Sequence, residues 1–221
     1  MSNQIESRRN FLKTAVAGAG AVATGAVVPA AETRAAEPMQ MSMPADEKHG
    51  AFFNSDDAAA VAAFAERIFP GAPGMPGARD ADVLNYIDLA LAGAYSDLQE
   101  FYRHGLNQLD AHCRATYRQP FARLDAKQQD EVVAALEAGH VQEFTWPSAR
   151  AFFTTLRTHT IEGMFADPVY GGNKDFAGWK LIGFPGAQEF FSKNEIQSRD
   201  AFSRAPMTGL QMQAAMPKRR G

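Results

Sequence analysis

Histidine and glutamate side chains are the groups in this sequence whose spacing could support metal binding or acid–base chemistry. Glu100 and His104 are four residues apart, so a helix would place them on one face, and His112 follows two turns later. Glu137-Ala-Gly-His140 reproduces one half of the Glu-x-x-His pair that holds two iron ions in di-iron proteins. The second half is missing from the sequence. A di-iron site is therefore not expected.

His159 and Glu162 occur in the opposite order, as His-x-x-Glu. Both side chains are good hydrogen-bonding groups, with or without a metal. We interpret each of them as a hydrogen-bonding residue at a helix end or at an interface.

Sulfur chemistry is restricted by the presence of a single cysteine, Cys113. One cysteine forms no internal disulfide, provides no Cys-x-x-Cys-His haem attachment site, and is too few for an iron–sulfur cluster. We expect Cys113 to be a half-buried structural thiol. Met39, Met41 and Met43 alternate, and their thioethers could bind a soft ion such as Cu(I), but no histidine or cysteine accompanies them before His49.

The motifs of nucleotide-dependent and hydrolytic enzymes are also missing from the sequence. No Gly-x-Gly-x-x-Gly run follows a predicted strand, and Gly18-Ala19-Gly20 lies within the apolar N-terminal run. No serine lies in a recognisable nucleophile elbow. We therefore expect no flavin site, no metal site and no catalytic residue in this chain.

The N-terminal residues have the pattern of a twin-arginine export signal. A cationic string, Ser7-Arg8-Arg9-Asn10-Phe11-Leu12-Lys13, precedes an uncharged Ala/Gly-rich run over residues 14–28. This run is too weakly apolar for a spanning helix, so removal near Ala30 or Ala35 is favoured over a retained membrane anchor. The twin-arginine route exports proteins that are already folded, often with a partner attached. The positions that define the signal are Arg8, Arg9, Phe11 and Leu12.

Composition divides the chain into four parts. Residues 1–35 form the signal, 36–50 a linker without periodicity, 51–190 a helical domain and 191–221 a C-terminal tail. The chain has a net charge of −3, and its first 35 residues carry four basic and two acidic side chains, which leaves the remainder near −5. This acidic balance argues against nucleic-acid binding, which requires a basic surface.

Apolar residues recur at helical spacing over five stretches of the chain. The predicted helices cover residues 54–69, 80–92, 96–117, 125–139 and 148–163. Asp125 and Gln128 have the spacing of a capping box at the start of the fourth helix. No stretch alternates as a half-buried strand would. We predict an all-α domain packed as an irregular helical bundle.

The character of the sequence changes after Pro168. Residues 170–186 contain five glycines, one proline and four aromatic residues, a mixture that favours neither a helix nor a strand. We predict a long aromatic and glycine-rich loop segment in an extended conformation. It serves either as a docking surface for another protein, since Trp, Tyr and Phe are frequent interface anchors, or as a structural lid over the bundle. The predicted interface residues are Tyr170, Gly171, Gly172, Asn173, Trp179, Lys180, Phe184 and Pro185.

This part of the chain also carries a family resemblance. The motif is Phe152-Phe153-x-x-Leu156-Arg157-x-His159-Thr160-x-Glu162-Gly163-x-Phe165-x-Asp167-Pro168-x-Tyr170-Gly171-Gly172-Asn173, followed by Gly178-Trp179-Lys180-Leu181-Ile182-Gly183-Phe184-Pro185-Gly186. It closely resembles the gluconate 2-dehydrogenase subunit 3 family, as do Tyr102-Arg103-x-Gly105-Leu106 and the helix end Ile68-Phe69-Pro70. The resemblance spans roughly residues 50–190.

The resemblance implies a function for the chain. Members of the family are small, non-catalytic subunits of exported dehydrogenase complexes that oxidise sugars, polyols or sugar acids. The large subunit carries FAD, and a membrane-bound multihaem cytochrome c subunit usually passes the electrons to quinones. The small subunit typically bears the signal that the twin-arginine translocase reads, and it stabilises and escorts the large subunit. The chain would then lie in the periplasm, associated with the inner membrane through its complex.

A second function stays open on the sequence alone. The chain could be an independent periplasmic α-helical metalloenzyme. Its candidate ligands are His104, His112, His140 and His159.

Overall fold

The computed structural model describes residues 50–188, 190–200 and 204–215. The predicted export signal, with Arg8, Arg9, Phe11 and Leu12, and the linker up to residue 49 lie outside these ranges. Within them, regular structure consists of α-helices and short 3-10 helices without a β-strand. The prediction of an all-α fold is thereby confirmed.

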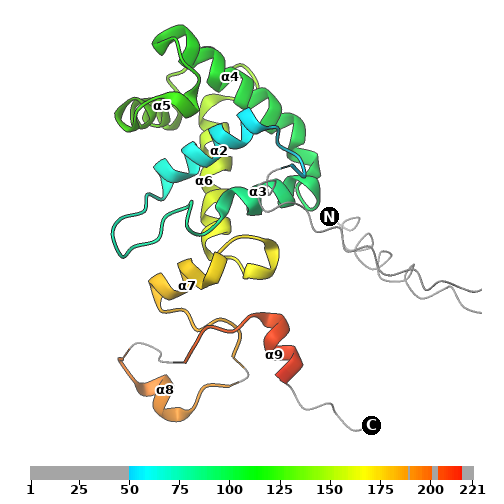
Figure 1. Cartoon of the computed structure of the whole chain (residues 1–221), viewed down its shortest axis with the longest axis vertical. Coiled ribbons are helices and arrows are strands. Elements are labelled where there is room, and N and C mark those ends of the chain that lie inside the picture. The colour runs from blue at the N-terminus through cyan, green and yellow to red at the C-terminus, as the bar shows by residue number, and fades with distance from the viewer. Residues whose placement is uncertain (1–49, 189, 201–203, 216–221) are drawn as a thin grey trace, which may run out of the picture. The chain divides into compact units, whose positions relative to one another are not determined.

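Helix α6 (Ala149–Phe165) is the central element of the bundle. It contacts α2 (Ser55–Ile68), α3 (Val83–Ala92), α4 (Gln99–Tyr117) and α5 (Ala126–Ala138), as Figure 1 shows. Side chains from all five helices bury together, which gives one contiguous core. Among the largest fully buried side chains are Phe64, Ile87, Leu91, Tyr102, Leu109, Phe121, Leu136, Phe152 and Leu156.

Helix ends follow the local sequence closely. The side chain of Asn54 accepts from two backbone N–H groups of the first turn of α2, and the Ser148 hydroxyl accepts from one, that of Ala151, at the start of α6. The predicted capping box of Asp125 and Gln128 is present at the start of α5. Gly139 ends α5 with a φ of 75°, a left-handed conformation that glycine adopts without steric cost.

Two predicted helix starts are shifted in the structure. The second helix begins at Val83 and not at residue 80, because Asp82 has a left-handed φ of 57° and breaks the helical run. The third helix is preceded by a 3-10 turn, η1 (Ser96–Leu98), and α4 itself begins at Gln99. A second short 3-10 turn, η2 (Phe121–Arg123), connects α4 to α5.

The segment of residues 166–186, hereafter the motif segment, is more regular than the sequence indicates. The prediction of an extended loop is wrong here, because the segment folds into η3 (Pro168–Tyr170), η4 (Lys174–Phe176) and α7 (Ala177–Ile182). Its glycines permit close packing: a Cβ atom at Gly178 would collide with the backbone carbonyl of Met164 at the end of α6. The glycines therefore bring short helical turns against α6.

The remaining described residues contain α8 (Lys193–Gln197) and α9 (Gly209–Ala215). An isolated bridge joins Gly186 to Met207, and the backbone N–H of Gly209 donates to Asp167 over 2.9 Å. None of the helices in the described ranges is both long enough and apolar enough to cross a membrane.

Candidate functional site

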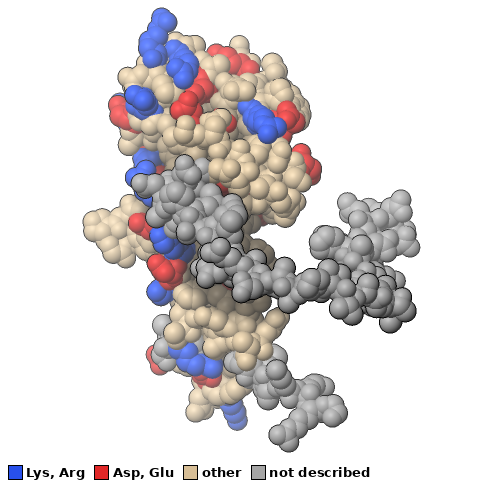
Figure 2. Space-filling model, turned by 45° about the vertical axis from the view of Figure 1, so that its right-hand side comes forward, with Lys and Arg blue, Asp and Glu red and all other residues tan. Residues whose placement is uncertain are grey.

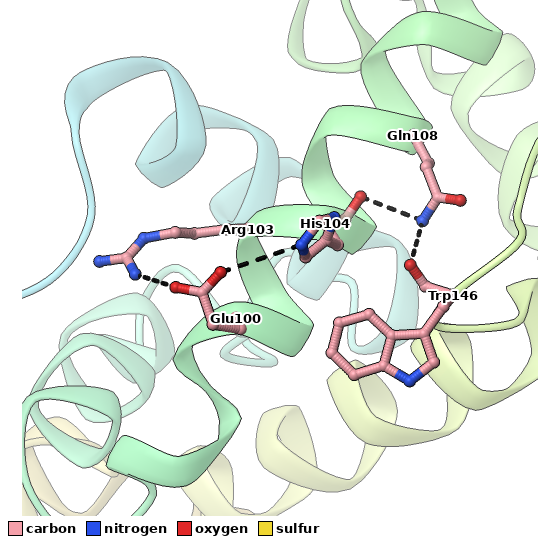
Figure 3. Close-up of polar contacts among 5 residues, drawn as sticks. All are labelled: Glu100, Arg103, His104, Gln108 and Trp146. Atoms are coloured by element: carbon pink, nitrogen blue, oxygen red, sulfur yellow. Dashed lines mark hydrogen bonds and ion pairs between the residues drawn. The ribbon is translucent and has the colours of Figure 1, made fainter.

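The structure places His104 in a surface network on α4 (Figure 3). Its Nε2 lies 3.9 Å from the carboxylate of Glu100, and both side chains are more than half exposed. The amide of Gln108 bridges the backbone carbonyls of His104 and Trp146, which presents the Trp146 ring to solvent beside the imidazole. An exposed ion pair of this kind contributes little to stability. His104 is a surface residue.

The other metal-ligand candidates are dispersed. His112 pairs with Glu143 at 3.2 Å, while Glu137 and His140 lie exposed near the end of α5. The described residues contain no group of three or more His, Cys, Asp or Glu side chains that could hold a metal ion. Cys113 is fully buried and not half-buried as expected, and burial raises its pKa to about 12, so the thiol stays protonated.

An apolar groove lies between α3, α6 and η3; we call it the α3–α6 groove. It has a volume of about 780 Å³, within the range of ligand and side-chain binding pockets. Four of its apolar side chains, those of Leu89, Ile161, Val169 and Tyr170, are substantially exposed. The groove is lined by Tyr86, Leu89, Ala90, Ala94, Tyr95, Ile161, Glu162, Phe165, Ala166, Val169 and Tyr170.

The hydrogen bonds between side chains that line the groove meet at the carboxylate of Glu162. The hydroxyl of Tyr86 donates to Oε2 of Glu162 over 3.1 Å, and that of Tyr95 donates to the same oxygen over 3.2 Å. Burial, and then the charge of Glu162, raise the pKa of both phenols, so the two tyrosines remain neutral donors. No described residue donates to the second oxygen, Oε1.

Behind the groove, three rings form a stack that reaches the core. The Tyr95 ring stacks on His159 with centroids 4.7 Å apart, and His159 stacks on Tyr102 at 5.8 Å. The Tyr102 hydroxyl and Nδ1 of His159 share a hydrogen bond of 2.7 Å. Burial lowers the pKa of His159, against the opposing charge of Glu162, so the imidazole is neutral near pH 7. His159 is therefore a buried residue within α6. The sequence predicted a hydrogen-bonding residue at a helix end or at an interface, whereas the hydrogen bond of His159 lies inside the core.

The eight predicted interface residues fall into three groups: three are exposed, two are partly buried and three are buried. Tyr170 is 63% exposed on the rim of the groove and Phe184 is 44% exposed, whereas Trp179 is only 5% exposed. Lys180 is also exposed, Gly171 and Pro185 are partly buried, and Gly172 and Asn173 are buried.

The buried members hold the motif segment together. Asn173 donates to the carbonyl of Ala166 over 2.9 Å, and its Oδ1 accepts from the backbone of Gly178 at 2.9 Å and of Trp179 at 3.4 Å. The indole N–H of Trp179 donates to the carbonyl of Phe165 over 2.6 Å. These contacts are the ones that the alternative of a structural lid predicts for Asn173 and Trp179. The predicted interface residues that a partner can reach are the exposed ones, Tyr170, Lys180 and Phe184.

A small pocket of about 170 Å³ lies at the other end of the motif segment. Lys180, Phe184 and Pro185 line it together with Trp179 and Arg204. The exposed members of the predicted interface thus lie at two places, Tyr170 at the α3–α6 groove and the others at this pocket.

Sequence reasoning missed the tyrosines of the groove. Tyr86 lies within an apolar helix stripe and Tyr95 within a short connection, and neither position carries a local signal. The available signal was the pair His159 and Glu162, one turn apart on a single helix.

The family of the chain follows from a comparison with protein families. The family described as gluconate 2-dehydrogenase subunit 3 matches residues 55–186, which extend from α2 to the end of the motif segment. The chain belongs to this family. Searches of the curated proteins and of the solved structures returned no match.

Proposed function

We propose that this chain is the non-catalytic small subunit of a periplasmic FAD-dependent dehydrogenase of the gluconate, sugar or polyol type, and that it docks on the catalytic large subunit. Membership of the subunit 3 family is the observation that carries the proposal. In this assignment the large subunit holds the FAD, and a cytochrome c subunit with several haems connects the complex to the inner membrane.

The exposed apolar rim of the α3–α6 groove supports docking at this face. Leu89, Val169 and Tyr170 each leave about half or more of their surface in contact with solvent. Neighbouring exposed apolar side chains around a concavity are typical of a binding site for another protein. Charged side chains of both signs lie interspersed on the face drawn in Figure 2, which favours a protein partner over a nucleic acid.

Docking is tested by co-purification of the tagged chain with its flavoprotein partner, read from flavin absorbance. Tyr170→Ala should weaken the complex by about tenfold or more if the ring is an interface anchor. Trp146→Ala is the matched control, because Trp146 is 55% exposed on a different surface. If Trp146→Ala dissociates the complex and Tyr170→Ala does not, the docking face is the α4 surface of Figure 3.

The proposal includes a role in export. The twin-arginine string lies on this chain, so a folded partner without a signal of its own would be carried across the membrane with it. Arg8→Lys combined with Arg9→Lys keeps the charge but removes the planar guanidinium groups. Fractionation should then find both the chain and the flavoprotein in the cytoplasm. Export of the flavoprotein in this variant would contradict the escort role and leave the docking role intact.

A further inference from the structure

We propose that the α3–α6 groove binds one arginine side chain of the large subunit, presented on an apolar segment, with the carboxylate of Glu162 as its counter-ion. The source of the side chain rests on the proposed function. The nature of the side chain rests on the groove itself, where Glu162 is the one charged residue among the described residues that line it.

The unpaired oxygen of Glu162 sets the first requirement on an occupant. Oε2 already accepts from Tyr86 and Tyr95, whereas Oε1 accepts from no described residue. A partner that covers the groove removes water from this oxygen. Burying a carboxylate oxygen without a donor is unfavourable, so a purely apolar occupant would be disfavoured. The occupant must therefore donate a hydrogen bond to Glu162.

The aromatic lining sets the second requirement. Tyr86, Tyr95, Phe165 and Tyr170 line the same groove as Glu162, and the faces of aromatic rings attract cations. The two tyrosines that donate to Glu162 cannot turn into additional anions near neutral pH, because their pKa values are raised. Charge and rings together favour a cation, and the carboxylate repels an anionic group.

A guanidinium fits this environment better than an ammonium group. It is planar, stacks on aromatic rings, is less strongly hydrated, and offers several donors in fixed directions to a carboxylate. The groove is larger than one such side chain needs, and its rim is made by the exposed side chains of Leu89, Ile161 and Val169. Apolar residues that flank the arginine would cover this rim.

The groove is held in shape before any partner arrives. The side-chain amide of Asn85 donates to the carbonyl of Gly171 over 2.7 Å, which ties the end of η3 to α3. The backbone N–H of Asn173 donates to the carbonyl of Gly163 over 2.7 Å, which ties the motif segment to α6. A preformed site loses less conformational entropy on binding than a flexible one.

The first experiment measures the dissociation constant of the complex between the full chain and its flavoprotein. Glu162→Gln removes the charge but keeps an oxygen that accepts from the two tyrosines. We expect this variant to weaken the complex at least tenfold, with the melting temperature of the free chain nearly unchanged. Glu137→Gln is the matched control, because Glu137 is an exposed glutamate near the end of α5. An unchanged dissociation constant for Glu162→Gln would overturn the inference.

The second experiment uses small probes on the free full chain and needs no partner. Hexylguanidinium, hexylammonium, hexan-1-ol and hexanoate are titrated, and binding is followed by the NMR signals of the tyrosine rings. We expect hexylguanidinium to bind at least tenfold more tightly than the alcohol or hexanoate, and to lose this advantage in Glu162→Gln. Equal binding of the alcohol would overturn the cation site, and equal binding of hexylammonium would overturn the assignment to arginine.

The two proposals fail in different ways. If the wild-type chain does not co-purify with any flavoprotein, the proposed function fails, and selective binding of hexylguanidinium would still support the cation site. If the complex forms and neither Glu162→Gln nor the probes show an effect, the function stands and the arginine site fails.

Discussion

The helical body, residues 55–165, and the motif segment, residues 166–186, are held in place by different kinds of interaction. In the body, large apolar side chains from five helices bury one another around α6. In the motif segment, backbone groups approach α6 closely and a single side chain, Asn173, makes three hydrogen bonds. Stability is therefore distributed over many residues in the body and depends on a few buried residues, Asn173 and Trp179 above all, in the segment.

This difference has a consequence for function. The α3–α6 groove has walls from both regions: Tyr86 and Glu162 come from the body, while Val169 and Tyr170 come from the motif segment. A change that loosens the motif segment alone would open one wall of the groove and leave the bundle folded. Substitutions in each region test this separation.

Phe152→Ala should have the largest effect on stability. Phe152 is fully buried on α6, and its ring lies within 6.5 Å of the ring centroids of Phe64 and Phe144. Removing a core phenylalanine typically costs about 3–5 kcal/mol, through lost burial and the cavity left behind. Chemical denaturation should give this loss, and amide hydrogen exchange should increase throughout the chain. An increase confined to one helix would show that the body is not a single cooperative unit.

Asn173→Ala should cost about 2–4 kcal/mol, because it leaves the buried backbone groups of Ala166 and Gly178 without partners. Asn173 also has a φ of 45°, which asparagine tolerates better than alanine does. We expect faster hydrogen exchange in the motif segment, with unchanged protection in α5. Asn107→Ala, an exposed position on α4, is the control. Uniformly faster exchange would contradict the separation of the two regions.

The helices were predictable because their signals are local. Asn54, Asp125, Gly139 and Ser148 lie where capping chemistry requires them, and the apolar stripes identify the buried faces. The motif segment misled the prediction, since its glycines serve close packing of short helices and not an extended chain.

The groove was not predictable because its polar partners are distant in sequence. Tyr86 and Tyr95 are 76 and 67 residues from Glu162. Asp88 is a similar case: this buried carboxylate accepts from four consecutive backbone N–H groups, those of residues 50–53, over 2.8–3.2 Å. In the sequence, Asp88 is only a polar residue within an apolar helix.

His159 should make the stability of the body depend on pH. Its pKa is lowered by burial in the folded chain, whereas the unfolded chain binds the proton near pH 6.5. The contribution of His159 to the free energy of unfolding is therefore fully present above about pH 6.5. It falls as the pH decreases from there toward the lowered pKa that His159 has in the folded chain, by at most about 1.4 kcal/mol per pH unit.

Denaturation of wild type and of His159→Gln at pH 8, 6.5 and 5.5 measures this dependence. The variant should be less stable at pH 8 but should have a flatter profile below pH 6.5. His140→Gln, at an exposed position, should keep the wild-type profile. If His159→Gln keeps the wild-type slope, another group causes the pH dependence.

Asp125→Ala should have the smallest effect, and it tests whether a local loss of stability in the body reaches the groove. The Asp125 carboxylate accepts from the backbone N–H of Gln128 over 2.9 Å at the start of α5, and the Gln128 side chain accepts from the N–H of Asp125 over 3.2 Å. Loss of such a cap costs about 1 kcal/mol. Because α5 contacts α2 and α6 but does not line the α3–α6 groove, binding of hexylguanidinium should be unchanged. A loss of about 1 kcal/mol with altered probe binding would mean that the cap of α5 influences the groove through α6, and the body walls of the groove would then have to be treated as coupled to the whole bundle.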